Sequence, residues 1–253
     1  VVVRDVQRVG VRRVDGVVAT HGDADHCGGL VDLLGEARVE RVLVPAGSEA
    51  ELCIGALASS RTVEPTAAGA GLRVGRLVLE VLAPGPRHRE PGNDASLVLR
   101  LEGLGRSFLF TGDIERRGEL LLVLEAEPES LRVDALKVAH HGSHSSTTSR
   151  FLELARPGWA VISAGRHNPF GHPATAVIDR LANAGAVVLR TDLDGQVRFR
   201  WDEGSWWVEP GPSRGPLTRE PAEPGSIALR RRPPRRFCTL ELATMSRNPI
   251  NIQ

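Results

Sequence analysis

Seven of the eight histidines in this 253-residue chain fall into short polar clusters that follow apolar segments. The first cluster runs from His21 to His26 and places Asp23 and Asp25 between its two histidines. Imidazole nitrogens and carboxylate oxygens together suit Zn²⁺ or a harder ion such as Mn²⁺. A polar loop with helix-capping aspartates is the alternative for this cluster, but the other histidine clusters favour a metal site.

Three further polar segments carry candidate chemistry. Asp113 follows the apolar segment that ends at Phe110, and a glycine before it lets the chain turn, so its carboxylate is placed to bridge two cations. His140 and His141 follow a third apolar segment. The side chains of adjacent histidines point apart, so at most one of the two is a direct metal ligand. The other would hydrogen-bond to a ligand or contact the substrate. The fourth segment spans residues 163–173 and ends in a Gly-His-Pro sequence.

Apolar periodicity predicts the elements that position these clusters. We expect strands over residues 14–19, 39–44, 77–82, 96–101, 107–110, 133–138, 160–163, 187–189, 196–201 and 206–208. We expect helices over residues 29–37, 48–60, 115–125, 147–155 and 173–184. Glycines at 103 and 105 predict a hairpin between two of the strands. Strands interspersed with helices indicate an α/β layer architecture, whose sites lie at the carboxyl ends of strands.

Composition is that of an ordinary globular protein, with 41% hydrophobic residues, 25% charged residues and a mean hydropathy of −0.14. No run approaches the roughly 18 apolar residues of a membrane helix, and no segment reads as a signal peptide. Three cysteines are too few and too scattered for a disulfide scaffold or a zinc motif with paired cysteines. Aromatic residues make up only 4%, with no tyrosine, and for Trp201, Trp206 and Trp207 a core role is favoured over nucleobase stacking.

Charge divides the chain into two parts. Residues 211–253 hold eight arginines, three glutamates and seven prolines, although the whole chain has a net charge of only +1. We interpret 1–210 as one domain and 211–253 as a basic, disordered tail, because such a segment buries too little surface to offset its ordering entropy. An arm that binds nucleic acid or anionic lipid is the alternative for the tail.

The run His21-x-Asp23-x-Asp25-His26-x-Gly28-Gly29 resembles the signature of the metallo-β-lactamase superfamily, with an aspartate at Asp23 where the usual form has histidine. The order of motifs over residues 10–205 resembles its ComEC branch, the DNA-uptake channel proteins of natural competence. The motifs that carry this second likeness are 93–99, 110–113, 137–143 and 163–173. The resemblance implies an α/β fold, an αββα sandwich with two metal ions at the edge between its sheets. Only about twenty residues precede His21, so we expect a fragment that lacks the first strands.

The resemblance also implies a ligand set for the first metal ion. His21 and Asp23 occupy the positions that hold it. The remaining ligand histidine of the superfamily falls near Asn93 or Asp94, where this chain offers oxygen instead of nitrogen. An oxygen-rich site favours Mn²⁺, with Zn²⁺ or Mg²⁺ as alternatives.

By the same resemblance, Asp25 and His26 hold a second metal ion. Asp113 bridges the two ions, and His141 or His140 completes the second site. Two divalent ions about 3.5–4 Å apart activate water as hydroxide and stabilise the oxygens of a phosphodiester.

The catalytic candidates beyond the ligands are residues placed to contact a phosphate or to protonate a leaving oxygen. Asp25 is included as both ligand and catalytic group. For Lys137, a strand-end lysine that merely reaches solvent is an equal alternative. The full set is Asp25, Lys137, His144, Asn168 and His172.

The leading hypothesis is a divalent-metal-dependent nuclease acting on DNA during competence uptake. The first alternative is a stand-alone hydrolase of a small phosphoester, thioester or lactam, and the second is a non-catalytic assembly domain of a membrane channel. Expected partners are DNA and the membrane portion of a longer parent protein. In that parent the chain would be membrane-associated. We expect no nucleotide cofactor, and the oligomeric state stays open.

Overall fold

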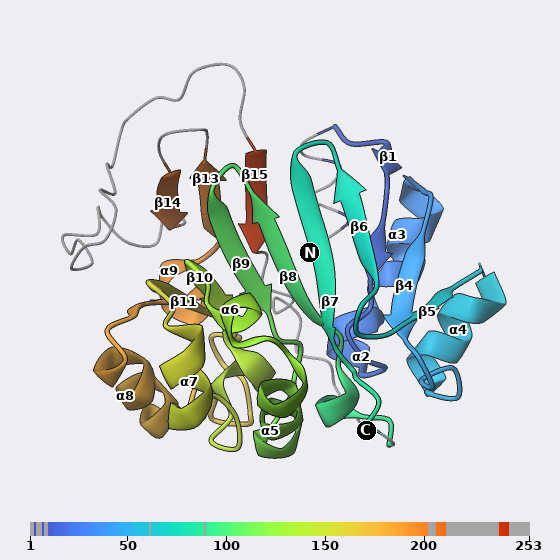
Figure 1. Ribbon diagram of the computed structural model, residues 1–253. Coiled ribbons are helices and arrows are strands. Elements are labelled where there is room, and N and C mark those ends of the chain that lie inside the picture. Colours follow the sequence, from blue (N-terminus) through green and yellow to red (C-terminus); the bar gives the residue numbers. More distant parts are fainter. Residues whose placement is uncertain are drawn as a thin grey trace.

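Seven strands make up the largest sheet in the computed structural model, which describes residues 3, 7, 10–60, 62–88, 90–201, 206–210 and 238–242. In spatial order they are β12 (Val187–Arg190), β11 (Trp159–Ile162), β10 (Ala135–Lys137), β9 (Arg106–Phe110), β8 (Val98–Gly103), β7 (Leu77–Ala83) and β6 (Gly71–Val74) (Figure 1). The pairs from β6 to β9 are antiparallel, and those from β9 to β12 are parallel. The predicted hairpin at residues 103–105 is present.

A smaller parallel sheet lies beside the large one and consists of β2 (Val17–Val18), β4 (Val42–Pro45) and β5 (Glu64–Thr66). A separate parallel pair joins β1 (Arg13–Val14) to β3 (Arg38–Val39). The single strands predicted over 14–19 and 39–44 are therefore each two short strands. The apolar runs are interrupted by Asp15-Gly16 and by Glu40-Arg41. As a result, the first pieces, β1 and β3, form one parallel pair, and the second pieces, β2 and β4, form another.

Helices cover the outer faces of both sheets. The large sheet carries α5 (Arg116–Glu125), α6 (Pro128–Leu131), α7 (Ser149–Ala155) and α8 (Thr175–Asn183), and the small sheet carries α3 (Leu30–Glu36) and α4 (Leu52–Ser60) (Figure 1). Phe151 of α7 packs with Leu109 and Ile162 of the large sheet in the main core. A second core joins Leu33 and Ile54 to Val44. Val18 of the small sheet packs against Val81 and Leu99 of the large sheet. The predicted αββα sandwich is thereby confirmed.

A third sheet lies at the end of the described chain and has the order β14 (Trp206–Pro210), β13 (Val197–Trp201), β15 (Cys238–Leu242). Phe199 of β13 is buried and meets Phe108 edge-on at 5.4 Å between ring centroids. β15 falls in the segment 211–253 that the sequence predicts as a tail, and the rest of that segment lies outside the described residues. The side chains of the tryptophans at 201, 206 and 207 also lie outside them.

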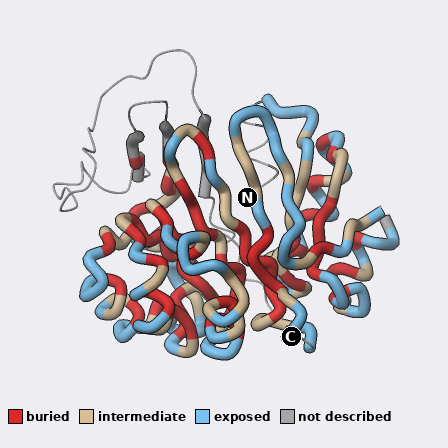
Figure 2. Tube along the Cα trace, in the orientation of Figure 1, coloured by how far each residue is buried: buried red, intermediate tan, exposed pale blue. Residues whose placement is uncertain are grey.

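In β7, Leu77 at the start of the strand is half-buried, whereas residues 81–83 at its end are buried (Figure 2). Because β9, β10 and β11 are parallel, their carboxyl ends meet at one edge of the sheet, and the loops that follow them emerge together. In the facing sheet, β2 is followed directly by the segment that contains the first histidine cluster. Within the described part of the chain, no helix combines the length and apolar character needed to cross a membrane.

Candidate metal centre

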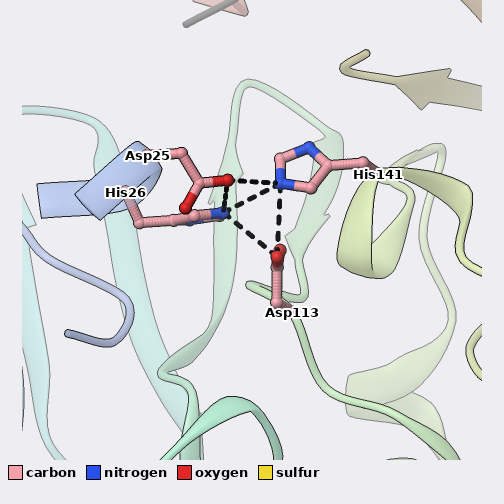
Figure 3. A group of neighbouring side chains, drawn as sticks. All are labelled: Asp25, His26, Asp113 and His141. Carbon is pink, nitrogen blue, oxygen red and sulfur yellow. Dashed lines mark hydrogen bonds and ion pairs between the residues drawn. The ribbon is translucent and has the colours of Figure 1, made fainter. Parts of the chain in front are cut away.

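Four side chains from three distant segments converge between the two sheets: Asp25, His26, Asp113 and His141 (Figure 3). One potential ligand atom from each lies within 4.8 Å of all the others. The Nε2 atoms of His26 and His141 are 3.1 Å apart, and Asp113 Oδ2 is 3.2 Å from each. Asp25 Oδ2 lies 3.2 Å from His141 Nε2. Two carboxylates and two imidazoles aimed at one point form a donor set suited to a divalent ion.

The first half of the cluster stands on a short helix, α2 (Ala24–Cys27), which begins a few residues after β2. Asp25 and His26 are consecutive on it. Thr20 Oγ1 lies 3.1 Å from Nδ1 of His26 and 3.2 Å from Nδ1 of His21. A hydrogen-bond partner on Nδ1 fixes the ring and leaves Nε2 as the ligand atom, so one hydroxyl orients two imidazoles. Cys27 at the end of α2 forms a disulfide with Cys53 of α4.

Asp113 follows β9 through a turn that requires glycine. Gly112 has a φ of +52°, and a Cβ at that position would lie 2.5 Å from Cβ of Ser96. The Ser96 hydroxyl accepts a hydrogen bond from the Asp113 backbone N–H at 3.1 Å. Asp113 is buried in this position and is only 3% exposed. The backbone turn and the serine together place a buried carboxylate at the centre of the cluster.

His141 is presented by the 3₁₀ turn η2 (Ala139–Gly142), in which three consecutive residues have positive φ. The φ angles are 45° at His140, 54° at His141 and 81° at Gly142. Non-glycine residues adopt this region only when the surroundings enforce it, and such positions gather at functional sites. Gly142 packs so closely on Pro173 that a Cβ would lie 2.6 Å from that ring, and His141 Nδ1 donates to the Ser163 carbonyl at 2.7 Å.

The electrostatics of the cluster are those of a cation site. Burial would raise the pKa of Asp113, but the Lys137 ammonium and hydrogen bonds from His141 and His26 hold that pKa well below its usual range. A hydrogen bond from His141 lowers the pKa of Asp25 to about 2. Burial opposes a proton on His141, yet Asp113 and Asp25 raise the pKa of its imidazole to about 9. Two ionised carboxylates therefore stabilise a positive charge between them.

A second set of donors adjoins the first. His21 is buried, its ring lies 4.2 Å from that of His26, and its Nε2 is 3.5 Å from Asp23 Oδ2. Burial and the neighbouring His26 lower the pKa of His21 to about 4, so its imidazole is neutral at pH 7, the form that binds metal. In the described structure, neither His21 Nε2 nor Asp113 Oδ1 has a hydrogen-bond partner, although both are buried. Buried polar atoms without partners are costly, and a bound cation would satisfy both.

The structure does not bring Asn93 and Asp94 into the four-residue cluster. Both belong to the 3₁₀ turn η1 (Asn93–Ala95). Asp94 Oδ1 accepts hydrogen bonds from the backbone N–H groups of Glu115 and Gly118 at 2.7 and 2.9 Å, at the start of α5. Carboxylates stabilise helix N-termini in this way. His140 also turns toward α5, with its Nδ1 2.9 Å from a Glu115 carboxylate oxygen.

The predicted catalytic residues lie at different distances from the cluster. Lys137 Nζ is 3.5 Å from Asp113 Oδ1 and donates to the Gly112 carbonyl at 3.2 Å. His172 is half-buried, with its ring 5.6 Å from that of His140, and burial followed by the charge of His140 lowers its pKa. The side chain of His144 is exposed.

Asn168 uses its amide on its own loop. Its Nδ2 donates to the carbonyls of Gly165 and His172, and its Oδ1 accepts from the backbone N–H of His172.

The sequence did not indicate the roles of the Thr20 and Ser96 hydroxyls. The only signal for Thr20 was a hydroxyl residue directly before the first histidine.

Comparisons with known proteins place this geometry in a family. A family model described as "Metallo-beta-lactamase superfamily" matches residues 4–166. ComE operon protein 3 of Bacillus subtilis (strain 168) is 34% identical over 197 residues, which cover 76% of this chain and 25% of that protein. Competence protein ComA of Neisseria gonorrhoeae is 33% identical over 203 residues, 80% of this chain and 28% of that protein. The chain therefore spans about a quarter of the length of these relatives.

Similar solved structures include the metallo-beta-lactamase fold protein YhfI from Bacillus subtilis, with 13% identity, a TM-score of 0.46 and coverage of 70% of this chain and 73% of that one. Recombination protein 2 of Haemophilus influenzae is 30% identical over 197 residues, covering 78% of this chain and 23% of that protein. On its family match and its identity to these ComEC-type proteins, the chain belongs to the metallo-beta-lactamase superfamily.

Proposed function

We propose that this chain is a divalent-metal-dependent phosphodiester hydrolase that cleaves DNA, as the nuclease part of a longer membrane-associated uptake protein. The observation that carries the proposal is the convergence of Asp25, His26, Asp113 and His141 on one point. The relative named competence protein ComA supports DNA as the substrate, and the chain's coverage of only 25–28% of its relatives' length supports a larger parent.

The proposed centre holds two ions. Asp25, His26 and His141 would hold one of them, and His21 and Asp23 would hold the other. Asp113 would hold both, because its Oδ2 lies 3.2 Å from Nε2 of His26 and of His141, while its buried Oδ1 accepts no hydrogen bond from the described residues. These residues offer three carboxylates and three imidazoles, and Asp23 supplies an oxygen donor where the usual signature has a histidine nitrogen, which favours Mn²⁺ over Zn²⁺.

The bound ions supply Lewis acidity, which lowers the pKa of a water molecule and stabilises charge on phosphate oxygens. The protein's own groups do the rest. Thr20 and the Ser163 carbonyl hold the imidazoles in orientation. Lys137 fixes Asp113 and adds a positive charge beside the phosphate. We assign His144 and His172 to the leaving oxygen, and Asn168 to holding the loop that carries His172.

The test uses the full chain, freed of metal by a chelator and reloaded with Mn²⁺, Mg²⁺ or Zn²⁺. Metal content by elemental analysis and cleavage of labelled single- and double-stranded DNA are then measured. We expect two ions per chain, the fastest cleavage with Mn²⁺ and none in chelator. Asp113→Asn should lower cleavage by about 100-fold or more and hold fewer than two ions. Asp32→Asn, an exposed carboxylate on α3, is the matched control and should behave as wild type.

Two other outcomes would replace the proposal. Metal-dependent hydrolysis of a small phosphoester, thioester or lactam without DNA cleavage would favour a stand-alone hydrolase. A chain that folds but neither retains metal nor hydrolyses any of these substrates would favour an assembly role in a membrane channel.

A further inference from the structure

Phe170 is a large apolar side chain that is 73% exposed. It belongs to the loop between β11 and α8. Its ring stacks on His172, with centroids 6.0 Å apart and planes inclined by 20°. The loop is held in shape by the three hydrogen bonds of the Asn168 amide. The ring is therefore presented to solvent in a fixed orientation.

A row of aromatic rings connects Phe170 with the metal cluster. The ring of His172 lies 5.6 Å from that of His140, which lies 6.3 Å from that of His141. The ring of His141 in turn lies 5.2 Å from that of His26. Phe170 is the outer end of this row, so a molecule that reaches from the cluster to solvent along the row meets its ring.

Phe170 is the one large apolar side chain on its loop, residues 163–174. Its neighbours along the loop are Asn168, Pro169, Gly171 and His172, and Arg166 and His167 on the same loop are exposed. A membrane or a protein partner needs a contiguous apolar patch, which a single ring among polar side chains does not provide. A flat ring on a loop that also carries an exposed arginine is a combination that binds an unpaired nucleobase and its backbone.

We propose that Phe170 is a stacking platform for an unpaired nucleobase of the strand whose phosphodiester lies at the cluster. This proposal rests on the proposed nuclease function and specifies its substrate as single-stranded DNA. In a duplex each base is already stacked between its neighbours and its face is not available to the ring.

The experiment compares wild type with Phe170→Ala and Phe170→Trp. The matched control is Leu120→Ala, which removes a 57% exposed apolar side chain from α5. Steady-state cleavage is measured on a single-stranded oligonucleotide, on the same strand with abasic sites, and on a duplex. Phe170→Ala should raise KM on the single strand by about 10-fold with kcat changed less than about two-fold. Phe170→Trp should keep the wild-type KM, because tryptophan also offers a flat ring. On the abasic strand, wild type and both variants should have the same KM.

Binding of a strand that contains 2-aminopurine gives a readout independent of turnover, because stacking quenches its fluorescence. We expect quenching with wild type and Phe170→Trp and its loss in Phe170→Ala. If wild type cleaves DNA but Phe170→Ala has unchanged KM and quenching, the stacking role fails and the nuclease function stands. Equal effects on single strand, abasic strand and duplex would also overturn it. If wild type cleaves no DNA, the nuclease function fails, and quenching alone then decides whether Phe170 binds a base.

Discussion

The Thr20 hydroxyl lies within hydrogen-bonding distance of two imidazoles, one in each proposed ion site. Thr20→Val keeps the shape of the side chain and removes the hydroxyl. We expect metal affinity to fall by about 10- to 100-fold, because His21 and His26 lose the partner that fixes their rings. Metal titration by calorimetry measures the loss.

Thr66→Val is the control, because it removes a buried hydroxyl from β5 that bonds only the Glu64 carbonyl in the described structure. It should leave metal affinity unchanged. Equal affinities for wild type and Thr20→Val would mean that packing alone orients the two rings.

At the scale of single residues, the sequence identified the ligand types but not all of their uses. The structure brings together Asp25, His26 and Asp113, three residues that the family resemblance assigned to the metal site. Asp94 was expected near the first ion, yet its Oδ1 accepts two N–H groups of α5. A carboxylate beside a turn suits a ligand and a helix cap equally, and only the position of the next helix distinguishes them. Of the paired histidines, the positive φ angles turn His141 toward the cluster.

At the scale of elements, the turn that carries His141 is fixed by helices behind it. Glu119 of α5 is buried and accepts hydrogen bonds from the backbone N–H groups of Thr147 and Thr148. Arg180 of α8 donates to the carbonyls of Thr147 and Ser146. One carboxylate and one guanidinium thus tie two helices to the segment that follows η2.

This arrangement predicts a pH dependence of stability. Burial raises the pKa of Glu119 above its ordinary value of 4.5, so the folded state holds a proton that the unfolded state releases. The stabilising contribution is full below pH 4.5 and is lost as pH rises through the raised folded pKa. Unfolding by urea is measured at several pH values for wild type and Glu119→Gln.

The difference in unfolding free energy between the two proteins should change over that window, with wild type losing stability relative to Glu119→Gln as pH rises. Subtracting the variant removes the contributions of all other groups. Parallel stability profiles for the two proteins would show that Glu119 does not titrate differently on folding.

Sequence patterns predicted long elements better than short ones. β7, β8 and β9 are rich in valine, leucine and phenylalanine and were expected within a few residues. β5 was missed because Pro65 lies at its centre, and proline argues against a paired strand. β15 was missed because its five residues lie in a segment rich in arginine and proline. Its pairing with β13 is long-range, and local periodicity carries no information about it.

At the scale of the whole molecule, a disulfide closes part of the smaller half. Cys27 and Cys53 are 26 residues apart and join α2 to α4. A link of this span stabilises a protein by about 3 kcal/mol, mainly by restricting the unfolded chain. We expect reductant to lower the free energy of unfolding of wild type by about that amount, as measured by urea titration.

Cys53→Ser is the control for this prediction. Its stability should match that of reduced wild type and should not respond to reductant. If oxidised and reduced wild type unfolded at the same urea concentration, the link would not contribute to stability in solution.

Of the four residues in the candidate metal centre, two lie next to the core of the small sheet and two lie next to the core of the large sheet. Asp25 and His26 precede Cys27, which is buried with the small sheet, whereas Asp113 and His141 adjoin residues buried with the large sheet. An ion bound by all four is a cross-link between the halves of the sandwich. By mass action, an ion at 100 times its dissociation constant adds about 2.7 kcal/mol to the folded state. At the proposed centre, ion availability would therefore set not only activity but also how firmly the two halves hold together.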